Sequence, residues 1–269
     1  MKSLLRINFV FFLILRGFIG LSSPQEISAR QTGGNAADPT QVATKMVSVT
    51  NDWLNGKLST PGVNVEVREV ARTNDGGRLI VQYHVFVTGA PKDQTYGLAT
   101  WPINSAGPAE QMKGLSIGAD GIVMCAGRTP DQCGDPNKKD DPVEFAFSPV
   151  RGEVIRLGLV SADGKLKVLF AVVPDPIVST SKNCSLEVLR VLPKFEATLV
   201  RAKGFQPNEE LVFASKSYDE SHENKVKADS NGGYATALLP FVKNHQDGVT
   251  NLQLKGASCV AEISFSWGK

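Results

Sequence analysis

The chain has 269 residues, of which 29 are basic and 27 are acidic. Removing residues 1–29 takes away three basic residues and one acidic residue, so the remainder carries 26 of each sign. Because no long run of one sign occurs, the composition excludes electrostatic capture of nucleic acid or of an anionic membrane surface. The length is ample for two hydrophobic cores.

The N-terminus has the layout of a secretory signal peptide. Lys2 and Arg6 precede an apolar run over residues 7–21 that Arg16 interrupts. The uninterrupted part is shorter than the roughly 20 apolar residues that a membrane span requires. We therefore predict a leader at residues 1–29 and no membrane span after its cleavage, with an uncleaved N-terminal anchor as the alternative.

A helix is predicted after a polar, glycine-containing tether at residues 30–37. Asp38 can accept a hydrogen bond at the N-cap, and Pro39 suits the first helical position. Gly56 can end the helix in the left-handed conformation. The apolar stripe between these points consists of Val42, Met46, Val49 and Trp53. We expect this stripe to cover a face or an edge of a β-sheet.

From residue 63 to residue 173, apolar and polar residues alternate with the period of two that is typical of β-strands. The segment from Leu79 to Val87 is the clearest, because every second residue from Leu79 is apolar. Three turn motifs separate such segments and supply residues that tolerate a positive φ. They are Asn74-Asp75-Gly76-Gly77, Ala119-Asp120-Gly121 and Ala162-Asp163-Gly164. About seven strands behind one helix predict a first β-sandwich domain over residues 38–178.

Pro174-Asp175-Pro176 and the polar residues 179–183 predict a linker, and we place the domain boundary there. About seven further strand patterns predict a second β-sandwich over residues 179–269. The last pattern is the most regular, with the apolar face Cys259, Ala261, Ile263, Phe265 and Trp267.

Four cysteines in an exported chain predict two disulfides, and three pairings are possible. We favour Cys125–Cys133 and Cys184–Cys259, because each pair then lies within one predicted domain. Cys184 and Cys259 both share a strand face with apolar residues. This pairing predicts a bridge between the first and last strands of the second sandwich.

Two turn motifs in the last third of the chain resemble those of the immunoglobulin-like modules of bacterial exported and surface proteins. Such modules often carry a Gly-Phe-x-Pro-x-Glu corner and a later Ala-Asp-x-x-Gly hairpin. Here the motifs read Gly204-Phe205-Gln206-Pro207-Asn208-Glu209-Glu210-Leu211 and Ala228-Asp229-Ser230-Asn231-Gly232-Gly233-Tyr234, followed by Leu238-Leu239-Pro240. The resemblance implies a fold and an extracytoplasmic setting, and it transfers no catalytic residue. The N-terminal domain resembles no characterised family.

Candidate binding residues cluster in the loop at residues 128–141, which the short disulfide would constrain. Its oxygen-bearing side chains are Asp131, Asp135, Asn137, Asp140 and Asp141. Calcium binds several such ligands on one loop, but the spacing is not that of an EF-hand and Lys138 and Lys139 lie among them. A solvated turn is the alternative, and we predict no metal site.

Sugar faces stack on exposed aromatic rings, and Trp101 and Tyr96 are the candidates for that role. Trp53 and Trp267 fall on apolar stripes and are expected in the core.

Signals of catalysis are weak. Gly114-Leu115-Ser116-Ile117-Gly118 matches the nucleophile-elbow string, but a hairpin turn rather than a helix follows, so Ser116 is expected to be an ordinary strand serine. His84, His222 and His245 are the only histidines, and no C-x-x-C spacing accompanies them.

These patterns predict a mainly β protein in which two β-sandwich domains, the first preceded by one amphipathic helix, follow a signal peptide. We expect an exported, non-enzymatic structural or interaction protein of a bacterial envelope, secreted or periplasmic, without a cofactor. Its partner would be a protein or a glycan outside the cytoplasm. The alternatives are a calcium-stabilised carbohydrate-binding module and a secreted hydrolase with loop carboxylates about 5–10 Å apart.

Overall fold

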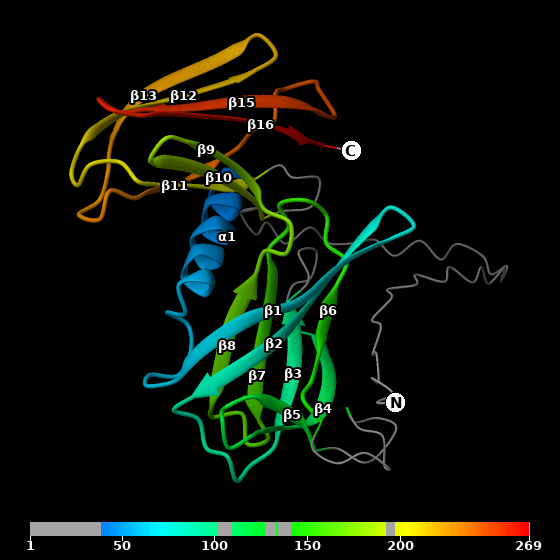
Figure 1. Ribbon diagram of the computed structural model, residues 1–269. Helices are drawn as coiled ribbons and strands as arrows, with labels where there is room; N and C mark the ends of the chain where they lie inside the picture. Colours follow the sequence, from blue (N-terminus) through cyan, green and yellow to red (C-terminus); the bar gives the residue numbers. More distant parts are fainter. Residues whose placement is uncertain (1–38, 102–108, 127–132, 134–140, 192–196, 269) are drawn as a thin grey trace, which may run out of the picture.

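The computed structural model describes residues 39–101, 109–126, 133, 141–191 and 197–268. Within these ranges the chain forms one helix and sixteen strands (Figure 1), so the prediction of a mainly β fold is confirmed. The first half comprises α1 (Pro39–Leu54), β1 (Asn64–Asp75), β2 (Arg78–Thr88), β3 (Tyr96–Trp101), β4 (Ala109–Ile117), β5 (Val123–Cys125), β6 (Phe145–Phe147), β7 (Ile155–Ser161) and β8 (Lys167–Val172). The second half comprises β9 (Ile177–Ser181), β10 (Cys184–Arg190), β11 (Thr198–Lys203), β12 (Glu210–Ser217), β13 (Glu220–Lys227), β14 (Tyr234–Leu238), β15 (Gly248–Lys255) and β16 (Val260–Trp267).

The first sandwich packs a sheet of order β1-β2-β6 against a sheet of order β5-β4-β3-β7-β8. Strand β2 shows why this core forms, since Val81, Tyr83, Val85 and Val87 are all buried as their alternation predicts. They join residues of the second sheet in one apolar cluster, among them Leu115, Leu157, Leu159 and Phe170.

The second sandwich packs sheet β14-β11-β10-β9 against sheet β13-β12-β15-β16. In β16 every second side chain is buried from Ala261 to Trp267, which confirms the predicted apolar face. Leu186, Leu211 and Leu254 are fully buried between the two sheets. The outward-facing residues of β16 are exposed, so one face of its sheet is open to solvent.

Both predicted disulfides are present. Cys125–Cys133 joins Cα atoms 5.5 Å apart and spans 8 residues of sequence. Cys184–Cys259 joins Cα atoms 6.2 Å apart, spans 75 residues and links the start of β10 to the residue before β16, on opposite sheets. The first strand of this sandwich is β9 rather than the strand that carries Cys184, which corrects the predicted position of the bridge.

The predicted linker at residues 179–183 is not a linker in the structure. Residues 177–181 form β9, which pairs with β10 through a tight turn in which Lys182 has φ 49°. Ile177 is buried in the second core. The sequence pattern did not reveal this strand, because it lies at a sheet edge and only Ile177 of its five residues is buried.

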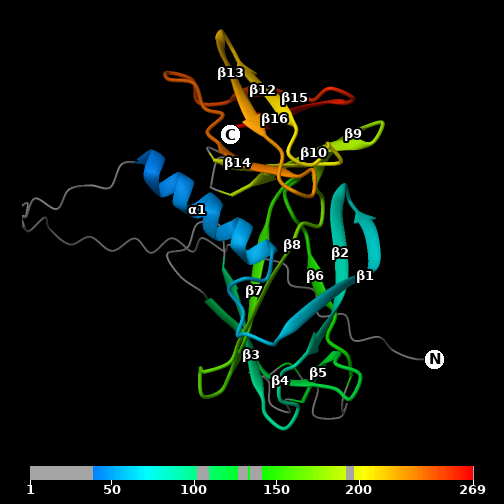
Figure 2. The same ribbon diagram turned by 90° about the vertical axis from the view of Figure 1, so that its left-hand side faces the viewer.

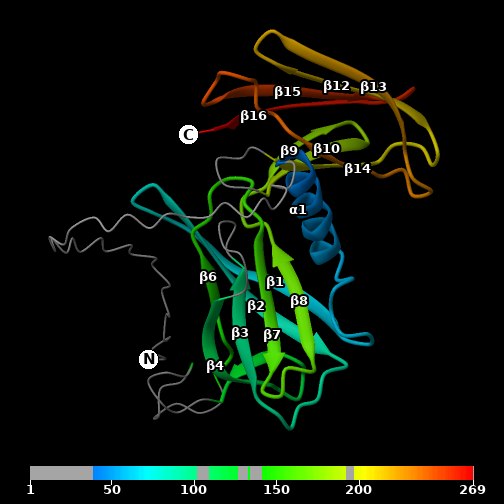
Figure 3. The same cartoon turned by 180° about the vertical axis from the view of Figure 1, so that it is seen from behind.

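The predicted helix is confirmed as α1, and Gly56 follows it with φ 67°. Asp38, the expected N-cap, lies outside the described residues. The buried face is rotated from the predicted stripe and presents Ala43, Val47, Thr50 and Trp53. Figures 2 and 3 show the reason, because α1 lies in the angle between the two sandwiches and packs against both.

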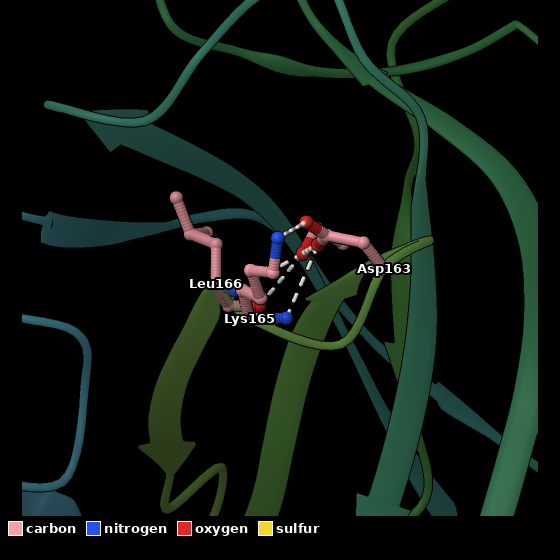
Figure 4. Close-up of polar contacts among 4 residues, drawn as sticks. Asp163, Lys165 and Leu166 are labelled. Atoms are coloured by element: carbon pink, nitrogen blue, oxygen red, sulfur yellow. Dashed lines mark hydrogen bonds and ion pairs between the residues drawn. The ribbon is translucent and has the colours of Figure 1, made fainter.

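All three predicted turn motifs connect paired strands. In the β1–β2 hairpin Gly76 and Gly77 both have a positive φ, as a two-residue turn of this hand requires. In the β7–β8 turn a carboxylate holds the loop (Figure 4): Asp163 Oδ1 accepts hydrogen bonds from Ser161 Oγ at 2.6 Å and from the Lys165 amide at 3.1 Å. These bonds lower the pKa of Asp163 below its ordinary value.

Candidate functional site

The acidic loop that the sequence singles out lies mostly beyond the structural description. Asp131, Asp135, Asn137 and Asp140 fall outside the described residues. Asp141 is exposed, and its carbonyl oxygen accepts a hydrogen bond from the Cys125 amide at 3.0 Å. The described part of the chain contains no group of three His, Cys, Asp or Glu side chains that could hold a metal ion.

Tyr96 does not offer a stacking surface, which corrects one of the two sugar-binding candidates. Its side chain is 2% exposed. The hydroxyl donates a hydrogen bond to the Pro91 carbonyl at 2.6 Å and accepts one from Gln94 Nε2 at 3.1 Å. Burial raises the pKa of the Tyr96 hydroxyl. A ring buried in this way supports the fold and presents no face to a sugar.

Trp101, the other aromatic candidate, packs against a core tryptophan. Its ring meets Trp53 edge to face with centroids 5.2 Å apart, and Trp101 is half-buried. Trp53 is buried as predicted, and its indole N–H donates to the Phe170 carbonyl at 2.6 Å and to the Leu157 carbonyl at 3.2 Å. The pair anchors α1 to the β7–β8 edge of the first sandwich.

The serine and the three histidines considered for catalysis lie in different parts of the fold. Ser116 lies within β4 opposite Met124 of β5, so it is a strand serine as expected. His84 lies on β2 and His222 on β13. His245 stacks on Tyr218 with centroids 3.7 Å apart. The structure brings none of these four side chains together into a nucleophile–base pair.

The feature that sequence reasoning missed is a hollow of about 510 Å³ on the open face of sheet β13-β12-β15-β16. Its lining comes from all four strands, and nine of its twelve residues are polar or charged: Ala214, Ser215, Lys216, Ser221, His222, Glu223, Asn251, Leu252, Gln253, Glu262, Ile263 and Ser264. No single strand carries a motif for it, since each contributes three consecutive residues of an ordinary strand.

Strand register arranges the outward side chains of this hollow in two rows that run across the strands. One row is Glu223, Ala214, Gln253 and Glu262, and the next is Ser221, Lys216, Asn251 and Ser264. Adjacent members of a row lie about one strand spacing, roughly 4.8 Å, apart. Ala214 is the smallest member and lies between larger side chains, so the surface is hollowed there.

Hydrogen bonds within the rows orient the polar groups. Gln253 Nε2 donates to Glu262 Oε1 at 2.5 Å, which leaves the second Glu262 oxygen and the Gln253 carbonyl oxygen for other donors. Ser264 Oγ donates to Asn251 Oδ1 at 2.5 Å, which leaves the Asn251 amide hydrogens for other acceptors. Lys216 adds a cation and Glu223 an anion. The hollow thus presents donors and acceptors side by side with both signs of charge.

Comparisons with known proteins add little to this geometry. No family model matches the chain, and no curated protein is similar to it in sequence. Among solved structures, red sea bream transglutaminase is similar over 78% of this chain with 8% identity and a TM-score of 0.23. This chain covers 31% of that enzyme's length. A TM-score this low carries no argument about fold or activity. In the described residues no helix is long and apolar enough to cross a membrane.

Proposed function

We propose that this chain is an exported, non-enzymatic binding protein whose second sandwich binds a polyhydroxylated ligand in the hollow of sheet β13-β12-β15-β16. The observation that carries the proposal is the pair of polar rows around Ala214. Hydroxyl groups both donate and accept hydrogen bonds, so a ligand rich in them matches a surface on which oriented amides, carboxylates and hydroxyls alternate. A glycan has this chemistry.

Export is supported by the two disulfides, because such bonds form and persist in oxidising compartments. The leader-like residues 1–29 agree with this setting. We also propose that the second sandwich is an immunoglobulin-like module of a bacterial envelope protein. The two turns that carry the resemblance support this, since each is held by a carboxylate. Glu209 accepts hydrogen bonds from the Ala257 and Gln206 amides, and Asp229 accepts from the Asn231 and Gly233 amides.

Binding rather than chemistry fits the open shape of the site. The hollow lies on a solvent-facing sheet, and its two carboxylates, Glu223 and Glu262, occupy opposite outer strands. Three strand spacings separate them, about 14 Å, which is beyond the roughly 5–10 Å over which two carboxyl groups cooperate in glycoside hydrolysis. The arrangement therefore supports recognition of a ligand across the strands.

The experiment is a screen of the purified full-length chain on immobilised neutral oligosaccharides, followed by calorimetry with a retained oligosaccharide. Ala214→Trp fills the hollow and should weaken binding at least about tenfold. Val178→Trp is the matched control, because Val178 is an exposed residue of β9 on the opposite sheet. Retention of no oligosaccharide by the wild-type chain, or equal affinity of Ala214→Trp and wild type, would overturn the proposal.

A further inference from the structure

Two of the outer strands in the described part of the molecule, β8 and β13, show how a free edge is protected. The segment after α1 covers the outer edge of β8. Ser59 Oγ donates a hydrogen bond to the Leu169 carbonyl and accepts one from the Leu169 amide. The Thr60 amide donates to the Lys167 carbonyl, and Thr60 Oγ1 accepts from the Lys167 amide. Strand β13 carries four charged side chains at its edge, namely Glu220, Glu223, Lys225 and Lys227. Charges and covering segments of this kind prevent edge-to-edge pairing.

Strand β14 lacks these protections. It is the outer strand of sheet β14-β11-β10-β9, and its sequence, Tyr234-Ala235-Thr236-Ala237-Leu238, contains no charge and no proline. Its pairing with β11 is regular, without a bulge. Ala235 is exposed and the other four residues are half-buried. An uncharged, regular and accessible edge is a template for another strand.

The backbone groups of β14 that point away from β11 belong to its two alanines, and of these the Ala237 carbonyl already accepts one hydrogen bond from Thr236 Oγ1 at 3.3 Å, which leaves its second lone pair. The Leu238 carbonyl is turned towards β11, where it accepts a hydrogen bond from Thr198 Oγ1 at 3.3 Å. Because backbone groups alternate along an antiparallel strand, Ala235 and Ala237 direct their N–H and C=O groups outward. No backbone group elsewhere in the described residues donates to or accepts from these outward groups.

We propose that β14 pairs with β14 of a second copy of this chain, antiparallel and centred on Thr236. In this register Ala235 lies opposite Ala237 of the partner copy, so the outward backbone groups of both copies meet and form a hydrogen-bonded pair on each side of the axis. Thr236 lies opposite its own counterpart, and Tyr234 lies opposite Leu238. Thr–Thr and aromatic–aliphatic pairs of this kind stabilise sheets.

A second copy is favoured over an unrelated peptide because the strand complements itself. A two-fold axis through Thr236 satisfies both alanines in both copies and generates a closed dimer rather than a filament. The two four-stranded sheets would then form one continuous sheet of eight strands. The hollow on sheet β13-β12-β15-β16 remains open in this dimer, so two ligand sites would be displayed on one particle. The pairing itself does not depend on what the hollow binds.

The test is disulfide trapping of the full-length chain. Thr236→Cys places one new thiol on the proposed axis, where the two Cα atoms of facing residues in a non-hydrogen-bonded pair lie about 4.5 Å apart. Asn224→Cys, at the middle of the charged edge strand β13, is the matched control. We expect a covalent dimer for Thr236→Cys under mild oxidation and little for Asn224→Cys.

A second variant tests the same pairing without introducing a new cysteine. Ala235→Lys adds a charge at the exposed outward position and should weaken dimerisation by about tenfold in sedimentation velocity. Because Ala235 is exposed, we expect the variant to fold, and circular dichroism checks that it does. A wild-type chain that sediments as a monomer at all accessible concentrations, or equal cross-linking of the two cysteine variants, would overturn the proposal.

Discussion

The two sandwiches share an architecture but are tied together differently. In the second, Cys184–Cys259 joins the two sheets covalently across 75 residues of sequence. In the first, Cys125–Cys133 spans 8 residues and constrains a local loop, so the two sheets are held together by side-chain packing. The comparison shows that one layered design can hold its two sheets together either with a long-range disulfide or by apolar packing alone.

The largest expected effect is the loss of unfolding free energy when a disulfide is removed, and it should differ between the two disulfides. Replacing Cys184 and Cys259 by alanine should lower the free energy of unfolding of the chain by about 4 kcal/mol, because the closed loop is long. Replacing Cys125 and Cys133 should lower it by about 2 to 3 kcal/mol, because that loop is short. Urea denaturation followed by tryptophan fluorescence measures both. Equal losses for the two double variants would contradict the contrast drawn between the sandwiches.

Two turn glycines give the next effect. Gly204 has φ 86°, and a Cβ atom there would lie 1.9 Å from the Asn183 carbonyl oxygen, so Gly204→Ala should cost about 3 kcal/mol through backbone strain and clash. Gly164 in the first sandwich has φ 72° with open space around it, and Gly164→Ala should cost about 1 kcal/mol. Thermal unfolding of the two variants measures the difference. Similar losses would show that the clash at Gly204 relaxes without strain.

The smallest effect concerns the turn carboxylates and is pH-dependent. Hydrogen bonds from the Gly233 and Asn231 amides lower the pKa of Asp229 below 3.8, and those from the Ala257 and Gln206 amides lower the pKa of Glu209 below 4.5. A lowered folded-state pKa stabilises the fold above the unfolded-state value, and this contribution disappears as the pH falls through the folded-state value.

The variants Asp229→Asn and Glu209→Gln should therefore melt at a lower temperature than wild type at pH 7, and the differences should shrink below about pH 4. Asp163→Asn is the comparison in the first sandwich, where the pKa of the carboxyl is lowered mainly by the Ser161 hydroxyl. A difference in melting temperature that stays constant between pH 7 and pH 3 would contradict the assignment to these carboxylates.

Local chemistry made much of the fold predictable. The Asp-Gly and Asn-Asp-Gly-Gly turns require residues that tolerate a positive φ, and the alternation in β2 and β16 requires one buried face. Strand β13 was only partly predictable, because an edge strand with nearly all side chains exposed leaves no apolar period. Which face of α1 is buried depends on its packing against the second sandwich as well as the first. The spacing of apolar residues along the helix carries no information about that packing.

The candidate site was not predictable for a related reason. Its rows run perpendicular to the chain, so Glu223, Ala214, Gln253 and Glu262 become neighbours only once the register of four strands is fixed. Of the sequence-based candidates, Tyr96 and Trp101 pack against other residues of the first sandwich, and most of the acidic loop lies outside the described residues. Side-chain type alone does not distinguish a packed ring from an exposed one.

The position of α1 also has a thermodynamic consequence. Ala43 and Val47 share one apolar cluster with Val154 of the first sandwich and with Leu189 and Leu199 of the second. Melting either sandwich alone would bring this common interior into contact with water. The two halves are therefore coupled in heat denaturation, and calorimetry should record one merged endotherm in place of two separate peaks.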